Sequence, residues 1–127
     1  MATAESQTFE LDVDSLSGLH WVGILAALVS GGIHLLLGIR MLPSGMGISF
    51  VLAGLGFLGA IVLVVINYRR PTVYAIGVPF TLVQIGLWYY VNFAAGQKSF
   101  PTDVGTLGAV DKVAQVLLLG ILVALLR

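Results

Sequence analysis

Hydrophobic residues gather into four long runs that are separated by short polar stretches. The runs cover residues 19–39, 46–66, 73–93 and 107–126. A helix of about 20 residues is roughly 30 Å long, which matches the hydrocarbon core of a bilayer. In lipid, a spanning segment must satisfy its own backbone hydrogen bonds, so each run is expected to be helical. The pattern therefore predicts an all-α protein with four transmembrane helices.

The connections between the runs set the expected topology. They are short and contain turn residues such as Pro43 and Pro71. Short connections place consecutive helices side by side and antiparallel. We therefore expect an up-down-up-down bundle in a single membrane domain, residues 18–127, with both termini on one side.

Residues 1–17 differ from the rest because they are polar and acidic, with no Lys or Arg. We expect this tail to be flexible, or to lie as a short amphipathic turn at the lipid headgroups. Ser15 or Ser17 could cap the first helix, because a serine side chain accepts hydrogen bonds from free backbone amides there.

Small residues recur at helical spacing in the first two runs. Such a stripe lets another helix backbone approach closely, so it predicts a helix-packing face. In both runs the positions follow one another at intervals of three or four residues. The predicted face consists of Gly23, Ala27, Gly31, Ser49, Ala53, Gly56 and Ala60.

Composition supports a membrane location and limits the partners. Hydrophobic residues make up 58% of the chain and charged residues only 9%, whereas soluble domains are about 25% charged. We therefore expect a multi-pass protein of the cell membrane in contact with lipid. Basic residues are nearly balanced between the two sides, and we place both termini in the cytoplasm. The net charge is zero and Arg69-Arg70 is the only basic cluster, which argues against nucleic acid.

Few polar side chains fall inside the apolar runs, and four of them form a candidate intramembrane site. His34 lies near the end of the first run, and Asp111 lies at a similar depth at the start of the fourth. If these helices are neighbours, the two groups could form a proton-sensitive pair. Gln115 lies one turn from Asp111, and Gln84 lies near the middle of the third run. The alternative is a purely structural polar clamp between helices, or a His34 ring that is hydrogen-bonded to a backbone carbonyl.

Asp111 and Lys112 are adjacent, so their side chains leave the helix about 100° apart. We expect that they do not pair well with each other. One should face the bundle while the other extends toward the headgroups. Structural anchoring is the simpler interpretation of these two charges.

The only two histidines, His20 and His34, are 14 residues apart on one face. This spacing, with glycines between, is similar to that of a cytochrome b helix that ligates two haems. Each haem would need a second axial ligand, which this chain could supply only by pairing with a second copy. A haem b is therefore an alternative to a protein without cofactors. Cysteine-based metal sites are excluded because the chain has no cysteine.

Several short motifs resemble small uncharacterised membrane proteins of haloarchaea. These are the acidic lysine-free tail, Ser-Gly-Leu-His-Trp at 17–21, Gly-Gly-Ile-His-Leu-Leu-Leu-Gly at 31–38, and the Asn-Tyr-Arg-Arg turn at 67–70. The resemblance covers most of the chain and implies an archaeal membrane protein, but it implies no activity.

Size and span count also resemble the small multidrug resistance transporters, which pair as dimers. That family has a membrane-embedded glutamate in its first helix, and the first run here has none. His34 would have to replace it.

We found no motif for a nucleophile, a phosphate loop or a paired metal site, so we do not expect an enzyme. The predicted function is helix–helix association, as a homo-oligomer or as an accessory subunit of a larger membrane complex. A second hypothesis is a small transporter or proton-linked permeation unit that uses His34 and Asp111. A dimeric b-type cytochrome that uses His20 and His34 is the third.

Overall fold

The protein is all-helical in a computed structural model that describes residues 10–127. The helices are α2 (Gly18–Met41), α3 (Gly45–Val65), α4 (Arg70–Tyr89) and α5 (Thr106–Leu126), and the π-helical turn η1 (Tyr90–Ala94) extends α4. All four long helices, with η1 counted as part of the third, are long and apolar enough to cross a membrane. Each overlaps one of the hydrophobic runs, so the expected number and order of helices are confirmed.

Two serines begin the first two helices. Ser17 caps α2 through a capping box, in which its side chain accepts a hydrogen bond from the His20 amide and the His20 ring bonds back to the Ser17 backbone. Ser44 caps α3 by accepting a hydrogen bond from the Gly47 amide. Both caps satisfy amides that have no partner inside their helix. Ser17, one of the two expected candidates, is therefore the residue that caps α2.

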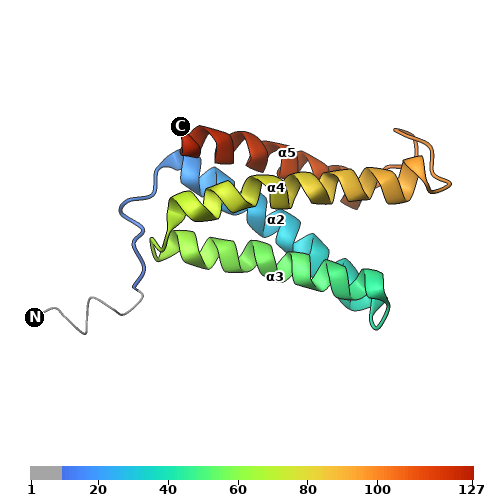
Figure 1. The fold of residues 1–127 in the computed structure, drawn as a ribbon, viewed down its shortest axis with the longest axis horizontal. Coiled ribbons are helices and arrows are strands. Elements are labelled where there is room, and N and C mark those ends of the chain that lie inside the picture. The colour runs from blue at the N-terminus through green and yellow to red at the C-terminus, as the bar shows by residue number, and fades with distance from the viewer. Residues whose placement is uncertain (1–9) are drawn as a thin grey trace, which may run out of the picture.

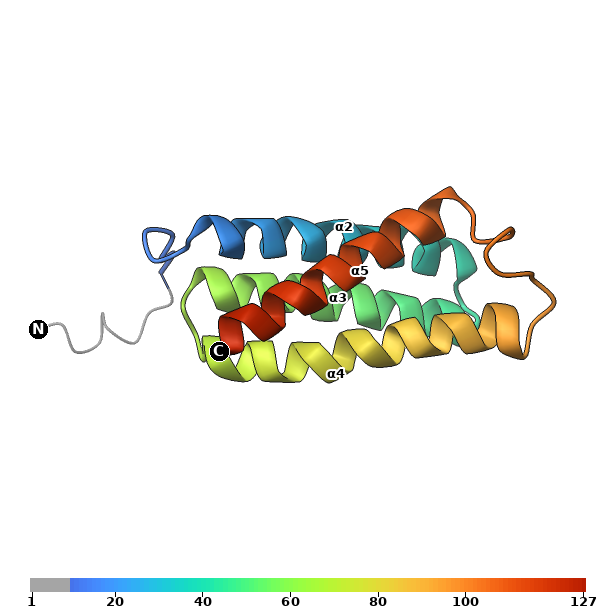
Figure 2. The same cartoon turned by 90° about the horizontal axis from the view of Figure 1, so that it is seen from above.

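Consecutive helices run in opposite directions, and the start of α2 and the C-terminus lie at the same end of the bundle (Figure 1). We call this the termini end, and the opposite end, with the turn at 42–44 and the loop at 95–105, the loop end. The helix α2 packs closely on α3 and also on α5, while α4 packs on α5. Figure 2 shows the same arrangement from above. By contrast, α3 and α4 make few contacts, and the pair α2–α3 diverges from the pair α4–α5 toward the loop end (Figure 1).

Glycines explain how closely α2 and α3 approach. A Cβ atom on Gly54 would lie 2.7 Å from the Leu35 Cγ and 2.9 Å from the carbonyl oxygen of Gly31. A Cβ atom on Gly31 would lie 3.0 Å from the Phe57 Cβ. These two helices therefore pack nearly backbone to backbone, as small residues allow.

Only some residues of the predicted packing face lie in the contact between α2 and α3, which we call the α2–α3 seam. Gly23 and Gly31 are covered, Gly23 by Ile121 of α5 and Gly31 by α3. On α3, Gly54 faces α2, whereas a Cβ on Gly56 would meet the Phe80 ring of α4. Ser49 is exposed and Ala53 and Ala60 are half-buried, and Ala27 is buried. The expected glycines of α2 are covered by neighbouring helices, but on α3 the stripe of small residues is centred about 130° around the helix from Gly54, the glycine that contacts α2.

At the termini end, the two helix pairs are held together by apolar contacts. The Phe57 and Phe80 rings meet edge to face, with centroids 5.2 Å apart. A Cβ on Gly77 would lie 3.0 Å from Leu122, so α4 also approaches α5 closely here. Side chains of α3, α4 and α5 therefore pack against one another in this half of the bundle.

The described part of the acidic tail is bound at the termini end. The Asp12 amide donates to the Val65 carbonyl at 2.7 Å. The Arg70 guanidinium donates to the Ser15 hydroxyl at 2.8 Å and to the Asp12 carbonyl at 3.1 Å. It also donates to the Val64 carbonyl, so one side chain ties the tail to the end of α3. Residues 10–17 are therefore held against the ends of α3 and α4 by these hydrogen bonds, and residues 1–9 lie outside the described residues.

Candidate functional site

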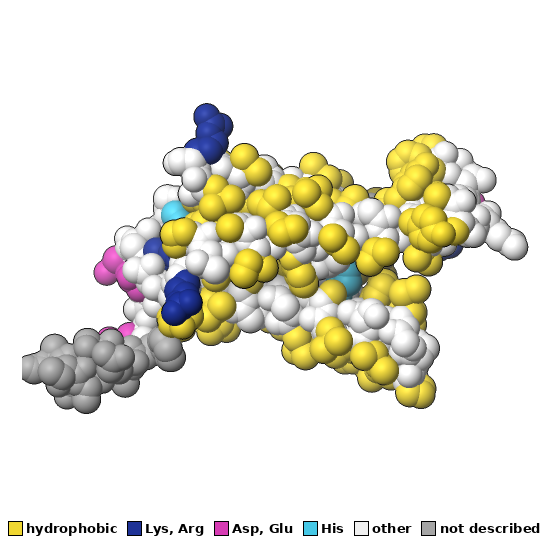
Figure 3. All heavy atoms as spheres, in the orientation of Figure 1, with side chains coloured by type: hydrophobic (Ala, Val, Ile, Leu, Met, Phe, Trp, Pro, Cys, Tyr) yellow, Lys and Arg dark blue, Asp and Glu magenta, His cyan; other side chains and the backbone are white. Residues whose placement is uncertain are grey.

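A cleft opens at the loop end, where the two helix pairs diverge. Its volume is about 570 Å³, and side chains of all four long helices line it. In the space-filling view, hydrophobic side chains border a hollow at this end, and the cyan side chain of a histidine shows within it (Figure 3). The apolar walls include Ile33, Leu37, Phe50, Leu87 and Val91.

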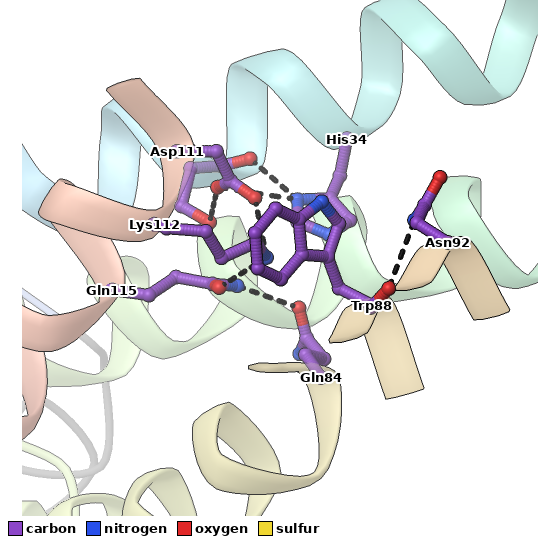
Figure 4. Close-up of polar contacts among 8 residues, drawn as sticks. His34, Gln84, Trp88, Asn92, Asp111, Lys112 and Gln115 are labelled. Carbon is purple, nitrogen blue, oxygen red and sulfur yellow. Dashed lines mark hydrogen bonds and ion pairs between the residues drawn. The ribbon is translucent and has the colours of Figure 1, made fainter. Parts of the chain in front are cut away.

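The floor of the cleft is polar and consists of a connected network (Figure 4). Asp111 is its centre. One carboxylate oxygen accepts a hydrogen bond from the Ser30 hydroxyl at 2.5 Å, and the other lies 2.9 Å from the Lys112 ammonium. Both Asp111 and Ser30 are buried. A buried carboxylate is stabilised only when such partners replace water, so these contacts allow Asp111 to be charged inside the bundle.

Asp111 and Lys112 therefore do pair, which corrects the expectation from their positions on the helix. The long Lys112 stem folds back across the 100° difference, because four rotatable bonds separate its ammonium from the backbone. The same ammonium donates to the Gln115 side-chain oxygen at 2.6 Å and lies 5.2 Å from the centroid of the Trp88 ring. Both charged side chains line the cleft. The expectation that one of them faces the bundle while the other extends toward the headgroups is therefore wrong.

His34 lies at the edge of this network. Its Nδ1 is 2.8 Å from the Ser30 carbonyl and 3.8 Å from the nearer Asp111 oxygen. The shorter contact assigns the Nδ1 proton to the carbonyl, so the imidazole is hydrogen-bonded to a backbone carbonyl and not directly to Asp111. The ring is held between Phe50 and Phe57, with centroid distances of 5.1 and 5.9 Å.

The two glutamines complete the network. Gln115 is fully buried and donates through its amide nitrogen to the Gln84 oxygen at 3.1 Å. The Gln84 nitrogen is a buried donor with no partner among the described residues. The structure thus brings together all four predicted polar residues, from α2, α4 and α5. It also adds Ser30, Lys112 and Trp88, which sequence reasoning did not include in the site.

The charges that line the cleft sum to a positive value. Lys98 and Lys112 line it, while Asp111 is the only carboxylate among residues 10–127 that does. Asp111 is already satisfied by Ser30 and Lys112, whereas the Gln84 nitrogen is still a free donor. The cleft is therefore better suited to a hydrogen-bond acceptor or an anion than to a cation.

The two histidines lie far apart along α2. His20 belongs to the N-terminal cap and lies beside Tyr74, with ring centroids 6.3 Å apart. Fourteen residues of helix put it about 21 Å from His34 along the axis. Among residues 10–127, no group of three or more His, Cys, Asp or Glu side chains could hold a metal ion.

Comparisons with known proteins place the chain in a family without giving it an activity. No curated protein and no solved structure matches it. Residues 4–126, nearly the whole chain, match a family of unknown function, DUF7475. The chain therefore belongs to the DUF7475 family of unknown function.

Proposed function

We propose that this protein is a small membrane permeation unit that binds an amphiphile with an anionic headgroup in the cleft and moves it together with a proton. The four long helices would cross the bilayer, with both termini on the cytoplasmic side. The observation that carries the proposal is the cleft itself, which combines apolar walls, a buried polar floor where Asp111 pairs with Lys112, and the additional positive charge of Lys98 at its rim. Ionisable residues inside a membrane are rare and usually functional.

The binding step follows from the arrangement of the walls and floor. An alkyl chain would pack on Ile33, Leu37 and Phe50, where it loses contact with water. An anionic headgroup would lie near the Lys112 ammonium. Lys98 at the rim would attract the anion from solution.

The proton step uses His34 and Asp111. A headgroup that draws Lys112 away from Asp111 leaves that carboxylate without its main counter-charge. Proton uptake by His34 or Asp111 then becomes favourable, because an uncompensated buried charge is costly. Binding of the anion and of the proton are coupled in this way, and coupling of two ligands is reciprocal.

Fluorescence quenching tests the charge preference directly. The chain has two tryptophans, so Trp21→Phe leaves Trp88 as the only one, and Trp88 lines the cleft. In lipid nanodiscs, a terminally brominated alkyl sulfonate should quench it saturably. The sulfonate should act at concentrations about tenfold lower than a brominated trimethylammonium amphiphile of equal length.

The matched control is Trp88→Phe, which keeps Trp21 at the termini end, 47% exposed. Both amphiphiles should quench Trp21 alike, through lipid partitioning. Equal quenching of Trp88 by the two amphiphiles, or stronger quenching by the cationic one, would contradict the binding proposal. In vesicles, a pH gradient should drive sulfonate uptake by the wild type, and His34→Gln should abolish the pH dependence while the protein stays folded.

The other hypotheses stay predictions. Association with a second copy or a larger complex would need surfaces other than the α2 glycine face, because α3 and α5 already cover Gly31 and Gly23. A haem b held by His20 and His34 would need two copies, and a Soret band in the purified protein would favour it.

A further inference from the structure

The cleft at the loop end is open sideways, between α3 and α4. These two helices make few contacts, and the contact between the Phe57 and Phe80 rings lies toward the termini end. On the opposite side, the hydrogen bond from Ser30 to Asp111 joins α2 to α5. Figure 1 shows α3 and α4 in front of α2, and in the same orientation the hollow with the histidine is open toward the viewer (Figure 3). This view is from the side of the bundle, so in a bilayer the opening would face lipid.

The edges of this opening are exposed and mainly apolar. Met46 and Ser49 line the cleft on the α3 edge, and Leu87 and Val91 line it on the α4 edge. Leu87 is 57% exposed, and Met46 and Val91 are each 43% exposed. The Ser49 hydroxyl donates to the Gly45 carbonyl of its own helix at 3.0 Å, so it offers no free donor at the edge. A hydrocarbon chain can therefore lie across the opening in contact with apolar surface.

The basic side chains inside the opening lie at the level expected for lipid headgroups. Tyr89 and Tyr90, which are 46% and 60% exposed, follow Trp88 on α4. Such aromatic belts lie at the interface between membrane and water. The Lys112 ammonium lies 5.2 Å from the centroid of the Trp88 ring, so it is at the same level. A phosphate could therefore meet this ammonium while the attached chains stay in the bilayer.

A second cation is available at the rim of the cleft. The Lys98 side chain lines the cleft, and its ammonium has no hydrogen bond or ion pair among residues 10–127. Lys112, by contrast, is shared between Asp111 and Gln115. Basic pockets between transmembrane helices bind anionic lipid headgroups. The charge of Lys98 therefore favours a ligand whose phosphate is a permanent anion.

We propose that the ligand of the cleft is an anionic phospholipid of the surrounding bilayer, which enters sideways between α3 and α4. Its phosphate lies between Lys98 and Lys112, and its chains leave through the opening along Phe50, Leu87 and Val91. The chains stay in contact with hydrocarbon throughout, so binding does not require the lipid to pass through water. This inference rests on the proposed function, because it names the amphiphile that the cleft binds.

Brominated phospholipids test the occupant. In nanodiscs of Trp21→Phe, where Trp88 is the only tryptophan, phosphatidylglycerol and phosphatidylcholine are compared at equal mole fraction. Both carry bromine at the same chain carbons, close to the glycerol. Phosphatidylglycerol should quench Trp88 several-fold more strongly and should saturate. In Trp88→Phe, the remaining Trp21 should be quenched in proportion to the mole fraction of either lipid. Equal quenching of Trp88 by the two lipids would overturn the proposal.

Two pairs of variants in the Trp21→Phe background test where the lipid lies. Lys98→Gln removes the unpaired charge from an exposed loop and should lower the preference for phosphatidylglycerol several-fold. Arg40→Gln, an exposed cation at the same end that does not line the cleft, should leave it unchanged. Ser49→Phe narrows the opening and should also lower the preference, whereas Leu52→Phe, on the outer face of α3, should not. A preference that survives in both Lys98→Gln and Ser49→Phe would overturn the proposed position.

The two proposals can fail separately. The brominated alkyl sulfonate has a single chain that fits inside the cleft, so Ser49→Phe should still bind it. Preferential quenching of Trp88 by the sulfonate, together with equal quenching by the two phospholipids, would remove the lipid inference and leave the proposed function. Absence of any preference for anions, in both the sulfonate and the phospholipid experiments, would remove both proposals.

Discussion

The two ends of the bundle are built from the same four helices, but they differ in what fills the space between the helix pairs. At the termini end, Phe57 meets Phe80 and Gly23 meets Ile121, and only a small cavity remains. At the loop end, the pairs separate and the space is a cleft with a charged floor. The apolar end holds the helix pairs against each other, whereas at the polar end they leave a cleft, where we propose that the ligand binds.

Removing the charge of Asp111 should have the largest effect on the loop end. Asp111→Leu leaves the Lys112 ammonium buried without its carboxylate, 2.9 Å from where the oxygen was. The free energy of unfolding should fall by about 3–5 kcal/mol, as for other broken buried ion pairs. Equilibrium unfolding in mixed micelles measures this loss.

The double variant Asp111→Leu/Lys112→Leu is the matched control. It removes both charges together and should recover most of the stability, because no unpaired charge remains. If the single and double variants are equally unstable, the ion pair is not what stabilises the floor of the cleft.

Filling the α2–α3 seam should have the next largest effect. Gly54→Leu forces a side chain against the Gly31 backbone and should cost about 1–3 kcal/mol of unfolding free energy. Gly59→Leu, on the same helix, meets no atom within 4 Å of its new Cβ and should be nearly neutral. Similar losses in both variants would show that glycine is needed on α3 for some reason other than packing against α2.

Releasing the tail at the termini end should have the smallest effect on overall stability. Arg70→Ala removes the hydrogen bonds to Ser15 and Asp12 and should cost about 1 kcal/mol or less. The local effect should be clear, because hydrogen exchange at the Asp12 amide should accelerate. Arg40→Ala, at the loop end, should leave this exchange unchanged. An equally protected Asp12 amide in Arg70→Ala would mean that the guanidinium does not hold the tail.

The sequence predicted the helices well because lipid-scale apolar runs and turn residues are strong local signals. It also predicted that His34 and Asp111 lie at a similar depth in the bundle, because the antiparallel order of the helices determines how far each residue lies from the loop end. It did not predict the Asp111–Lys112 pair, because the path of a flexible lysine stem depends on what surrounds it. Periodicity likewise favoured Gly56 over Gly54, because large apolar residues lie three and four positions from Gly54 and no stripe of small residues passes through it.

The cleft and the bound tail were beyond sequence reasoning for a different reason. Both depend on how far the helix pairs diverge and on the contacts of Arg70, and neither leaves a periodic pattern. Ser30 lies four residues before His34 on the same face. It could have been included in the polar site from this spacing alone, because residues four apart on a helix are neighbours.

Cysteine labelling on α3 tests most directly whether the loop end holds a hydrated, anion-attracting cleft. Ala53→Cys lies in the cleft, and Leu52→Cys, at a position 63% exposed, lies on the outer face. In vesicles, Ala53→Cys should react with a sulfonate-bearing thiol reagent faster than with its trimethylammonium counterpart, and Leu52→Cys should react with neither. Equal rates at the two positions, or a faster reaction of Ala53→Cys with the cationic reagent, would contradict the account.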